Sequence, residues 1–183
     1  MKNKEQKLFS ILQNNNIKIE KDIFLYGYRI FTDYLLFSFI TLPILIYNKC
    51  LKIAIIFIFL YSLLRKYIGG YHFNNRYLCI IISSLVTMFI SIFINLFKFN
   101  KWIVWIISCI LIINTILFTP IDHKNKKLNF KEKKYYKKKA ILIEIVYVIM
   151  LLFITKNNNI YKLINIVFLL SNINIILGIL FNN

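Results

Sequence analysis

The chain has few charged residues for its length, and acidic residues are especially scarce. Its 183 residues include 7 Asp and Glu against 24 Lys and Arg, and charged residues make up 17% of the chain. Soluble domains contain about 25% charged and about 45–50% apolar residues, whereas 59% of this chain is hydrophobic. A soluble fold of this size could not bury so much apolar surface, so we expect an integral membrane protein.

Cysteine and histidine are scarce too. The three cysteines have no paired spacing, which argues against a disulfide framework. A structural zinc site needs four nitrogen or sulfur ligands, but the chain has 2 histidines and contains neither Cys-x-x-Cys nor His-x-x-x-His. We therefore predict no metal and no cofactor. The segment from Met1 to Gln13 lacks the apolar core and cleavage site of a signal peptide, so we expect the first span to remain in the mature protein.

Long apolar runs make up most of the remaining sequence, and several approach the roughly 20 residues that cross a bilayer. We predict an all-α integral membrane protein with about six transmembrane helices, forming one membrane domain over residues 1–183. Residues 1–30 mix apolar and charged side chains irregularly and are predicted to form an interfacial helical arm. The predicted spans cover about residues 31–47, 50–66, 78–97, 102–119, 140–155 and 160–181.

The net charge of +17 would suggest nucleic acid in a soluble protein, but here the basic residues stand between apolar runs. With the N-terminus inside, 18 of the 24 basic residues fall in cytoplasmic segments, nine of them between Lys124 and Lys139. Because cytoplasmic loops are enriched in Lys and Arg, we predict a multi-pass protein of the cell membrane with both termini in the cytoplasm. No nucleic-acid partner is expected.

Reactive residue types are densest in residues 65–79, which contain a basic pair, two glycines, a histidine and a cysteine. A thiol becomes a nucleophile when a neighbouring imidazole takes its proton, and nearby cations stabilise the thiolate. His72 and Cys79 supply the imidazole and the thiol. A lone histidine at a membrane boundary is more often an interfacial polar residue, however, and a lone cysteine more often simply packs, so spacing alone leaves both interpretations open.

The spacing of His72 and Cys79 sets a condition on any catalytic role. Seven residues of straight helix separate two side chains by roughly 10 Å along the axis, whereas proton transfer needs about 3 Å. The backbone must therefore be broken or re-entrant around residues 65–79, and Gly69-Gly70 permits such a break. We place Cys79 at the start of the third span, where its thiolate would meet the positive end of the helix dipole.

The arginine, Gly-Gly-x-His and downstream cysteine of this segment resemble the pattern of the accessory gene regulator B (AgrB) family. Residues 119–126, Thr-Pro-Ile-Asp-His-Lys-Asn-Lys, are similar to the family's Pro-x-Asp-x-x-Asn-Lys element after the fourth span. Lys127 stands where the family often has proline. Chain length and the number of spans also agree with the family.

This resemblance implies a membrane cysteine endopeptidase that cuts a precursor of the AgrD type on its C-terminal side. An acyl-enzyme thioester then leads to a cyclic thiolactone or lactone peptide used in quorum sensing. By matching position, Cys79 would be the nucleophile and His72 its general base, with Arg65 stabilising charge and Gly70 setting backbone geometry. The resemblance also suggests a homodimer. The third residue that orients His72 stays open among Asn74, Asn75, Glu20, Asp22 and Asp33.

Two further features have more than one interpretation. The basic loop can anchor the protein on anionic membrane lipids, and Lys131, Lys133 and Lys134 can also hold the acidic tail of the precursor. Asp33 and Glu144 stand inside apolar runs, where an ionisable residue is by default a functional candidate. The alternative function is a non-catalytic transporter or peptide-export component with a path lined by Asp33 and by asparagines of the sixth span.

Overall fold

Six α-helices and one 3-10 turn form the part of the chain described by the computed structural model, namely residues 9, 20–71, 75–121, 128–156 and 158–181. Within those residues there is no strand, only an isolated bridge between Gly69 and Ile121. The predicted all-α fold is confirmed. The elements are α2 (Lys21–Tyr47), α3 (Leu51–Ile68), α4 (Arg76–Phe93), η1 (Ile94–Leu96), α5 (Lys101–Phe118), α6 (Phe130–Phe153) and α7 (Asn159–Phe181).

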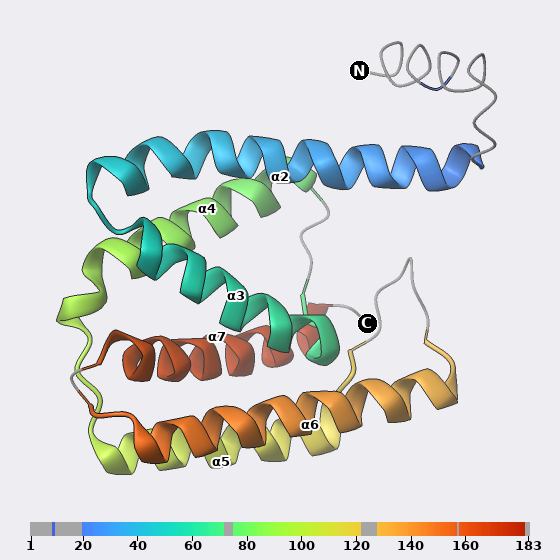
Figure 1. The fold of residues 1–183 in the computed structure, drawn as a ribbon. Coiled ribbons are helices and arrows are strands. Elements are labelled where there is room, and N and C mark those ends of the chain that lie inside the picture. The colour runs from blue at the N-terminus through green and yellow to red at the C-terminus, as the bar shows by residue number, and fades with distance from the viewer. Residues whose placement is uncertain (1–8, 10–19, 72–74, 122–127, 157, 182–183) are drawn as a thin grey trace.

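Successive helices run in opposite directions, so that the helix ends gather in two places (Figure 1). At one end, which we call the Gly69 end, α3, α5 and α7 finish while α2, α4 and α6 begin. At the other, which we call the Lys101 end, α3, α5 and α7 begin and the remaining helices finish. Residues 69–75 therefore link two helix ends at the Gly69 end.

The core forms around α7, which packs against α3, α5 and α6. Leu64, Leu111, Ile164 and Phe168 are fully buried there. Many large apolar side chains elsewhere face outward, notably along α2 and α5. An outer surface of this kind suits lipid and would be a liability in water.

Four helices of the described chain are long and apolar enough to cross a membrane, which supports a multi-pass membrane protein. Helix α3 carries three basic residues, Lys52, Arg65 and Lys66, and the first half of α6 is rich in lysine, so neither helix is among the four. The predicted boundaries of six spans, and their orientation, stay predictions. The four helices are Lys21–Tyr47, Arg76–Leu96 (α4 with η1), Lys101–Phe118 and Asn159–Phe181.

Helix α2 begins at Lys21, inside the predicted arm of residues 1–30, and continues through position 30 to Tyr47. Residues 1–8 and 10–19 lie outside the described residues, so the arm stays a prediction. Pro43 lies near the end of α2. Proline has no backbone N–H to donate, and transmembrane helices tolerate it because neighbouring groups satisfy the carbonyl that is left without a partner.

Candidate functional site

The chain is broken at Gly69 and Gly70, as the sequence predicts. Helix α3 ends at Ile68, and both glycines have positive φ angles, 77° and 136°. Such angles are accessible to glycine at little cost and are strained for other residues. Helix α4 begins only at Arg76, so the segment from Arg65 to Cys79 contains two helix ends instead of one continuous helix.

The glycine turn is packed so closely that neither residue could carry a side chain without displacing a neighbour. A Cβ on Gly69 would lie 2.6 Å from the carbonyl oxygen of Ile121, and one on Gly70 would lie 3.2 Å from Cβ of Asn174. The Ile121 amide also donates a 3.0 Å hydrogen bond to the carbonyl of Ile68. The turn is therefore held between the segment after α5 and helix α7.

Arg65, on the last turn of α3, binds three oxygens around this turn. Its Nη1 donates to the Tyr61 hydroxyl at 2.7 Å and to Oδ1 of Asn174 at 2.9 Å. Its Nη2 donates to the carbonyl of Tyr71 at 2.9 Å. Charge-assisted hydrogen bonds of this kind are stronger than neutral ones. Arg65 thus ties α3, α7 and the residue that precedes His72 to one another.

Asn174 and Tyr61 complete this arrangement. Neither was predicted to belong to the peptidase site, although Asn174 is one of the sixth-span asparagines that the alternative transport function would use. The Asn174 amide group donates to the Tyr61 hydroxyl, so Tyr61, Arg65 and Asn174 bind one another. The spacing of Tyr61 and Arg65, one helical turn, was a usable signal. Nothing local marked Asn174 as a partner of Arg65 and Tyr61, because both residues lie more than 100 positions earlier.

Cys79 lies in the first turn of α4 and is half-buried. The Asn75 side chain caps this helix by accepting a 3.0 Å hydrogen bond from the Tyr77 amide, and the Cys79 amide donates to the Asn75 carbonyl at 3.2 Å. The thiol therefore stands at the helix end where amide dipoles favour negative charge. Its placement at the start of α4 agrees with the prediction.

His72 and Asn74 lie outside the described residues, so their approach to Cys79 stays a prediction. The described chain fixes the two ends of their segment. On one side, Arg65 holds the Tyr71 carbonyl. On the other, Arg76 forms an ion pair with Asp33 and donates to Thr32 and to the Arg29 carbonyl of α2.

These contacts engage two of the candidates for a third site residue. Asn75 caps α4 through its side-chain oxygen, and Asp33 pairs with Arg76. Glu20 and Asp22 stand at the beginning of α2. The Asp33 contact links α2 to α4 at the Gly69 end, which gives this carboxylate a structural role.

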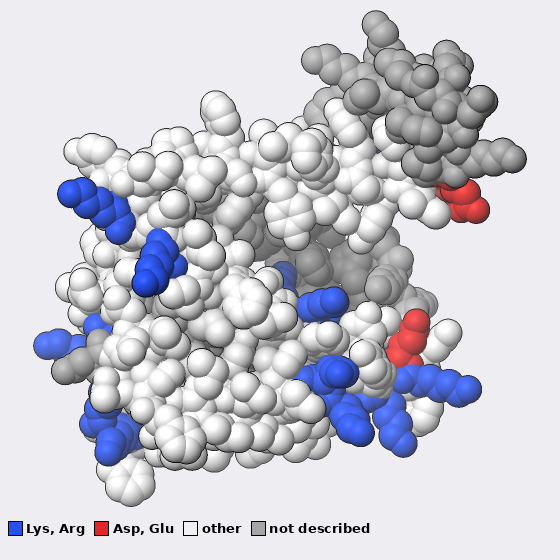
Figure 2. Space-filling model, viewed as in Figure 1, with Lys and Arg blue, Asp and Glu red and all other residues white. Residues whose placement is uncertain are grey.

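The predicted substrate lysines also lie at the Gly69 end. Lys131, Lys133 and Lys134 belong to the first turns of α6, which Asn129 and Glu132 cap reciprocally. Figure 2 shows Lys and Arg side chains gathered where α6 begins. Tyr136 on α6 contacts Tyr67 near the end of α3, with ring centroids 5.6 Å apart. The basic turns of α6 thus neighbour the helix that carries Arg65.

Glu144 is fully buried between helices, so it does not extend from its span to the membrane interface. It accepts a 2.5 Å hydrogen bond from Thr115 on α5. Its second carboxylate oxygen has no partner among the described residues. Asn114 and Asn172 similarly join α5 to α7 at 2.8 Å. These polar groups bind helix to helix within the core.

Across the residues that the structure describes, no group of three or more His, Cys, Asp or Glu could hold a metal ion. All three cysteines are free thiols, Cys50 buried and Cys109 exposed on α5. Among the described residues, neither Cys50 nor Cys109 forms a hydrogen bond with Arg65 or with the residues that Arg65 binds.

Comparison with known proteins supports the sequence resemblance. The family model described as Accessory gene regulator B matches residues 5–178. Two curated proteins of Clostridium perfringens, from strain SM101 and strain 13, carry names that provisionally describe them as AgrB-like. Each is 32% identical over 105 residues, covering 54% of this chain and 49% of its own length. The match therefore spans about half the length of these relatives. No solved structure matches significantly.

Proposed function

Because this chain belongs to the accessory gene regulator B family, we propose that it is a membrane-embedded cysteine endopeptidase that processes an AgrD-like precursor peptide. One structural observation carries the proposal. Cys79 stands in the first turn of α4, while Arg65 binds the carbonyl of Tyr71, the residue before His72. Both ends of the segment that contains His72 are thereby anchored at the Gly69 end.

The first step is acylation of Cys79. The thiol transfers its proton to His72, and the thiolate attacks the scissile carbonyl of the precursor. The peptide C–N bond then breaks, and His72 returns the proton to the leaving amine. The C-terminal tail departs, and the N-terminal part of the precursor remains bound to Cys79 as a thioester.

The second step closes the ring. A thiol or hydroxyl inside the bound peptide attacks the thioester carbonyl, its proton passes to His72, and Cys79 leaves as a thiolate. The product is a thiolactone or a lactone. Exchange between two thioesters is nearly isoenergetic, so water must be kept from the intermediate, and a site at a membrane boundary favours this.

Arg65 and Gly70 have supporting roles in this scheme. The guanidinium of Arg65 holds the turn through Tyr61, Asn174 and Tyr71, and its charge helps to stabilise the oxyanion that forms during attack. Gly70 adopts a φ of 136° against Asn174, so its contribution is the backbone path that leads to His72.

The basic turns of α6 provide a second contact for the precursor. Lys131, Lys133 and Lys134 attract the acidic tail of an AgrD-like peptide toward the Gly69 end. The same charges bind anionic membrane lipids. We further propose that the protein works as a homodimer, as the family resemblance suggests, in the quorum-sensing pathway of its cell.

The deciding experiment is cleavage of a co-expressed precursor, followed on a gel. Cys79→Ala and His72→Ala should abolish cleavage while the protein still inserts in the membrane. Cys50→Ala and Cys109→Ala serve as matched controls and should cleave normally, because neither thiol belongs to the site. A thioester captured between Cys79 and the N-terminal fragment would support the mechanism directly. Normal cleavage by Cys79→Ala would refute it.

The competing function is a non-catalytic transporter or peptide exporter. The buried polar contacts between Asn114 and Asn172 and between Thr115 and Glu144 are the features that favour it. These groups bind one another across helices, which is also the ordinary way in which membrane helices associate. A transporter would keep its function in Cys79→Ala, so the same gel, combined with export of the product, separates the two proposals.

A further inference from the structure

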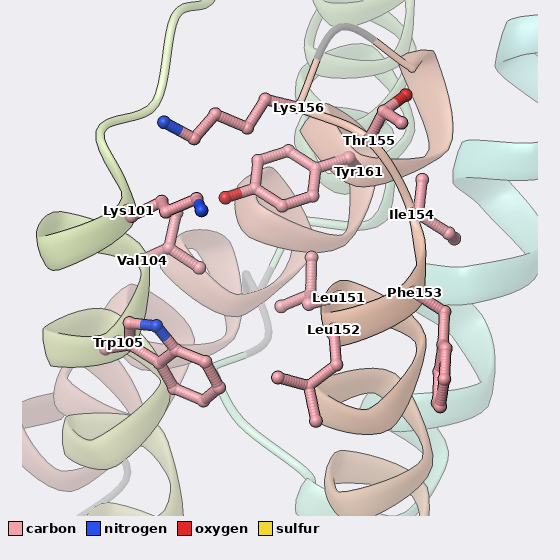
Figure 3. A pocket seen from close by; sticks show the side chains of 10 residues that line it. All are labelled: Lys101, Val104, Trp105, Leu151, Leu152, Phe153, Ile154, Thr155, Lys156 and Tyr161. Carbon is pink, nitrogen blue, oxygen red and sulfur yellow. The ribbon is translucent and has the colours of Figure 1, made fainter.

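A pocket opens at the Lys101 end (Figure 3). This end lies across the bundle from the Gly69 end (Figure 1). It lies between the start of α5, the end of α6 and the start of α7, and its volume is about 500 Å³. Pockets of about 300–1,000 Å³ are typical of small-molecule sites. No residue of the proposed peptidase mechanism lines this pocket, so the peptidase reaction gives it no role.

The pocket has a cationic side and an apolar side. Figure 3 shows the ammonium groups of Lys101 and Lys156 on the same side of the pocket as the hydroxyl of Tyr161. Trp105 and Leu152 form the other side. Tyr161 is buried, whereas Leu152 is 61% exposed on the outer surface of the bundle. The apolar wall thus continues from the lysines onto the surface that faces lipid.

None of the described residues that line the pocket is acidic, so no carboxylate of the lining neutralises these two lysines. The sequence contains no Asp or Glu between Asp33 and Asp122, and none after Glu144. The helices that bound the pocket therefore carry acidic residues only at Glu132, in the first turn of α6, and at the buried Glu144. Two neighbouring cations without an acidic partner repel one another, and a bound anion would relieve that repulsion.

Lysines at this end also oppose the predicted topology. In the predicted orientation the Lys101 end is the outer one, where the positive-inside rule disfavours basic residues. Lys101 and Lys156 nevertheless flank a shared pocket there. A binding function would give these two lysines a role that the predicted topology does not.

We propose that this pocket binds the phosphate of an anionic phospholipid headgroup in the leaflet at the Lys101 end. Lys101 and Lys156 pair with the phosphodiester, and the Tyr161 hydroxyl donates a hydrogen bond to it. The acyl chains descend along Trp105 and Leu152. A soluble phosphate would use the cationic side alone, whereas a lipid also uses the apolar wall that opens onto the hydrocarbon.

The chain offers a built-in reporter for this site. It contains 2 tryptophans, and Trp105 lines the pocket whereas Trp102 does not. The Trp102→Phe variant of the full-length protein therefore has one tryptophan, at the pocket wall. In phosphatidylcholine bilayers, replacing part of the lipid with brominated phosphatidylglycerol should quench Trp105 more than brominated phosphatidylcholine does. The preference expected is on the order of fivefold for each lysine that contacts the phosphate.

Charge variants in this background test the assignment. Lys101→Gln with Lys156→Gln should make quenching by the two lipids equal, while Lys101→Arg with Lys156→Arg should keep the preference. The matched control, Lys49→Gln with Lys52→Gln, removes two exposed lysines from the same end outside the pocket and should also keep it.

Three results would overturn the proposal. The first is equal quenching by both lipids before any lysine is changed. The second is an equal loss of preference in the Lys49 and Lys52 control, which would indicate general surface attraction. The third is loss of the preference on adding glycerol phosphate at constant ionic strength, because a soluble phosphate would then be the ligand. Persistence in its presence supports the lipid.

Discussion

Arg65 and Asn174 stand 109 residues apart in the sequence, and a 2.9 Å hydrogen bond joins Nη1 of the arginine to Oδ1 of the asparagine. Arg65 at the same time holds the carbonyl of Tyr71, and Asn174 lies against Gly70. Helix α7 thus forms one wall of the turn that leads from α3 toward α4. The last helix of the chain takes part in a site whose motif residues all lie between positions 65 and 79.

Asn174→Leu should slow precursor cleavage on the order of tenfold, because it removes the hydrogen bonds that Asn174 makes with Arg65 and with Tyr61, at a cost of about 1–3 kcal/mol. Asn174→Asp should keep most of the activity, since a carboxylate accepts from both Arg65 and Tyr61. The measurement is kcat and KM for a synthetic precursor in proteoliposomes. Asn95→Leu, at an exposed position of η1, is the control. An Asn174→Leu enzyme as active as its parent would contradict the role of this contact.

Gly69→Ala should destabilise the turn and remove most activity. The residue has φ of 77°, and the new Cβ would lie 2.6 Å from the Ile121 oxygen, so strain of about 1–3 kcal/mol adds to the displacement of Ile121. Gly27→Ala is the matched control, because nothing lies within 4 Å of its Cβ position and alanine favours the helix. Thermal unfolding in detergent and precursor cleavage measure the two effects. Equal behaviour of the two variants would be evidence against a required glycine turn.

Replacing Lys131, Lys133 and Lys134 with glutamine should raise KM for the precursor several-fold at low salt and less at high salt, because ions screen exposed charges. The value of kcat should change little, since these lysines do not touch the reacting bond. Glutamine at Lys49, Lys52 and Lys98, all exposed, removes the same charge at the Lys101 end. If both triple variants shifted KM equally, the effect would belong to overall charge and not to a contact with the precursor tail.

Glu144→Ala should lower the free energy of unfolding by about 2–4 kcal/mol, because it creates a cavity and leaves Thr115 unpaired in the core. Glu144→Gln should be milder, since its amide oxygen still accepts the hydrogen bond from Thr115. Leu142→Ala, on the exposed side of the same helix, measures the effect of truncating a side chain that is not buried. Thermal unfolding of the detergent-solubilised variants distinguishes the three. A Glu144→Gln variant as unstable as Glu144→Ala would argue against the Thr115 contact.

Much of this protein was determined by local sequence. Apolar runs of membrane-crossing length specify helices wherever they occur, because an unpaired backbone in lipid is too costly. Gly69-Gly70 specified the break between α3 and α4, because positive φ angles are open to glycine and not to its neighbours. The reactive types at Arg65 and Cys79 and the family pattern were likewise visible without a structure.

The contacts between helices depended on the tertiary structure, because the packing of all the helices together determines which faces meet. The pairing of Arg65 with Asn174 joins residues on α3 and α7, and that of Asp33 with Arg76 joins α2 and α4. The two lysines of the pocket at the Lys101 end, Lys101 and Lys156, are 55 positions apart. Propensity and periodicity act over a few residues, so they place each side chain on its own helix but cannot say which partner it meets. Asn174 therefore contacts Arg65 and Gly70 only because α7 packs against α3 in the folded protein.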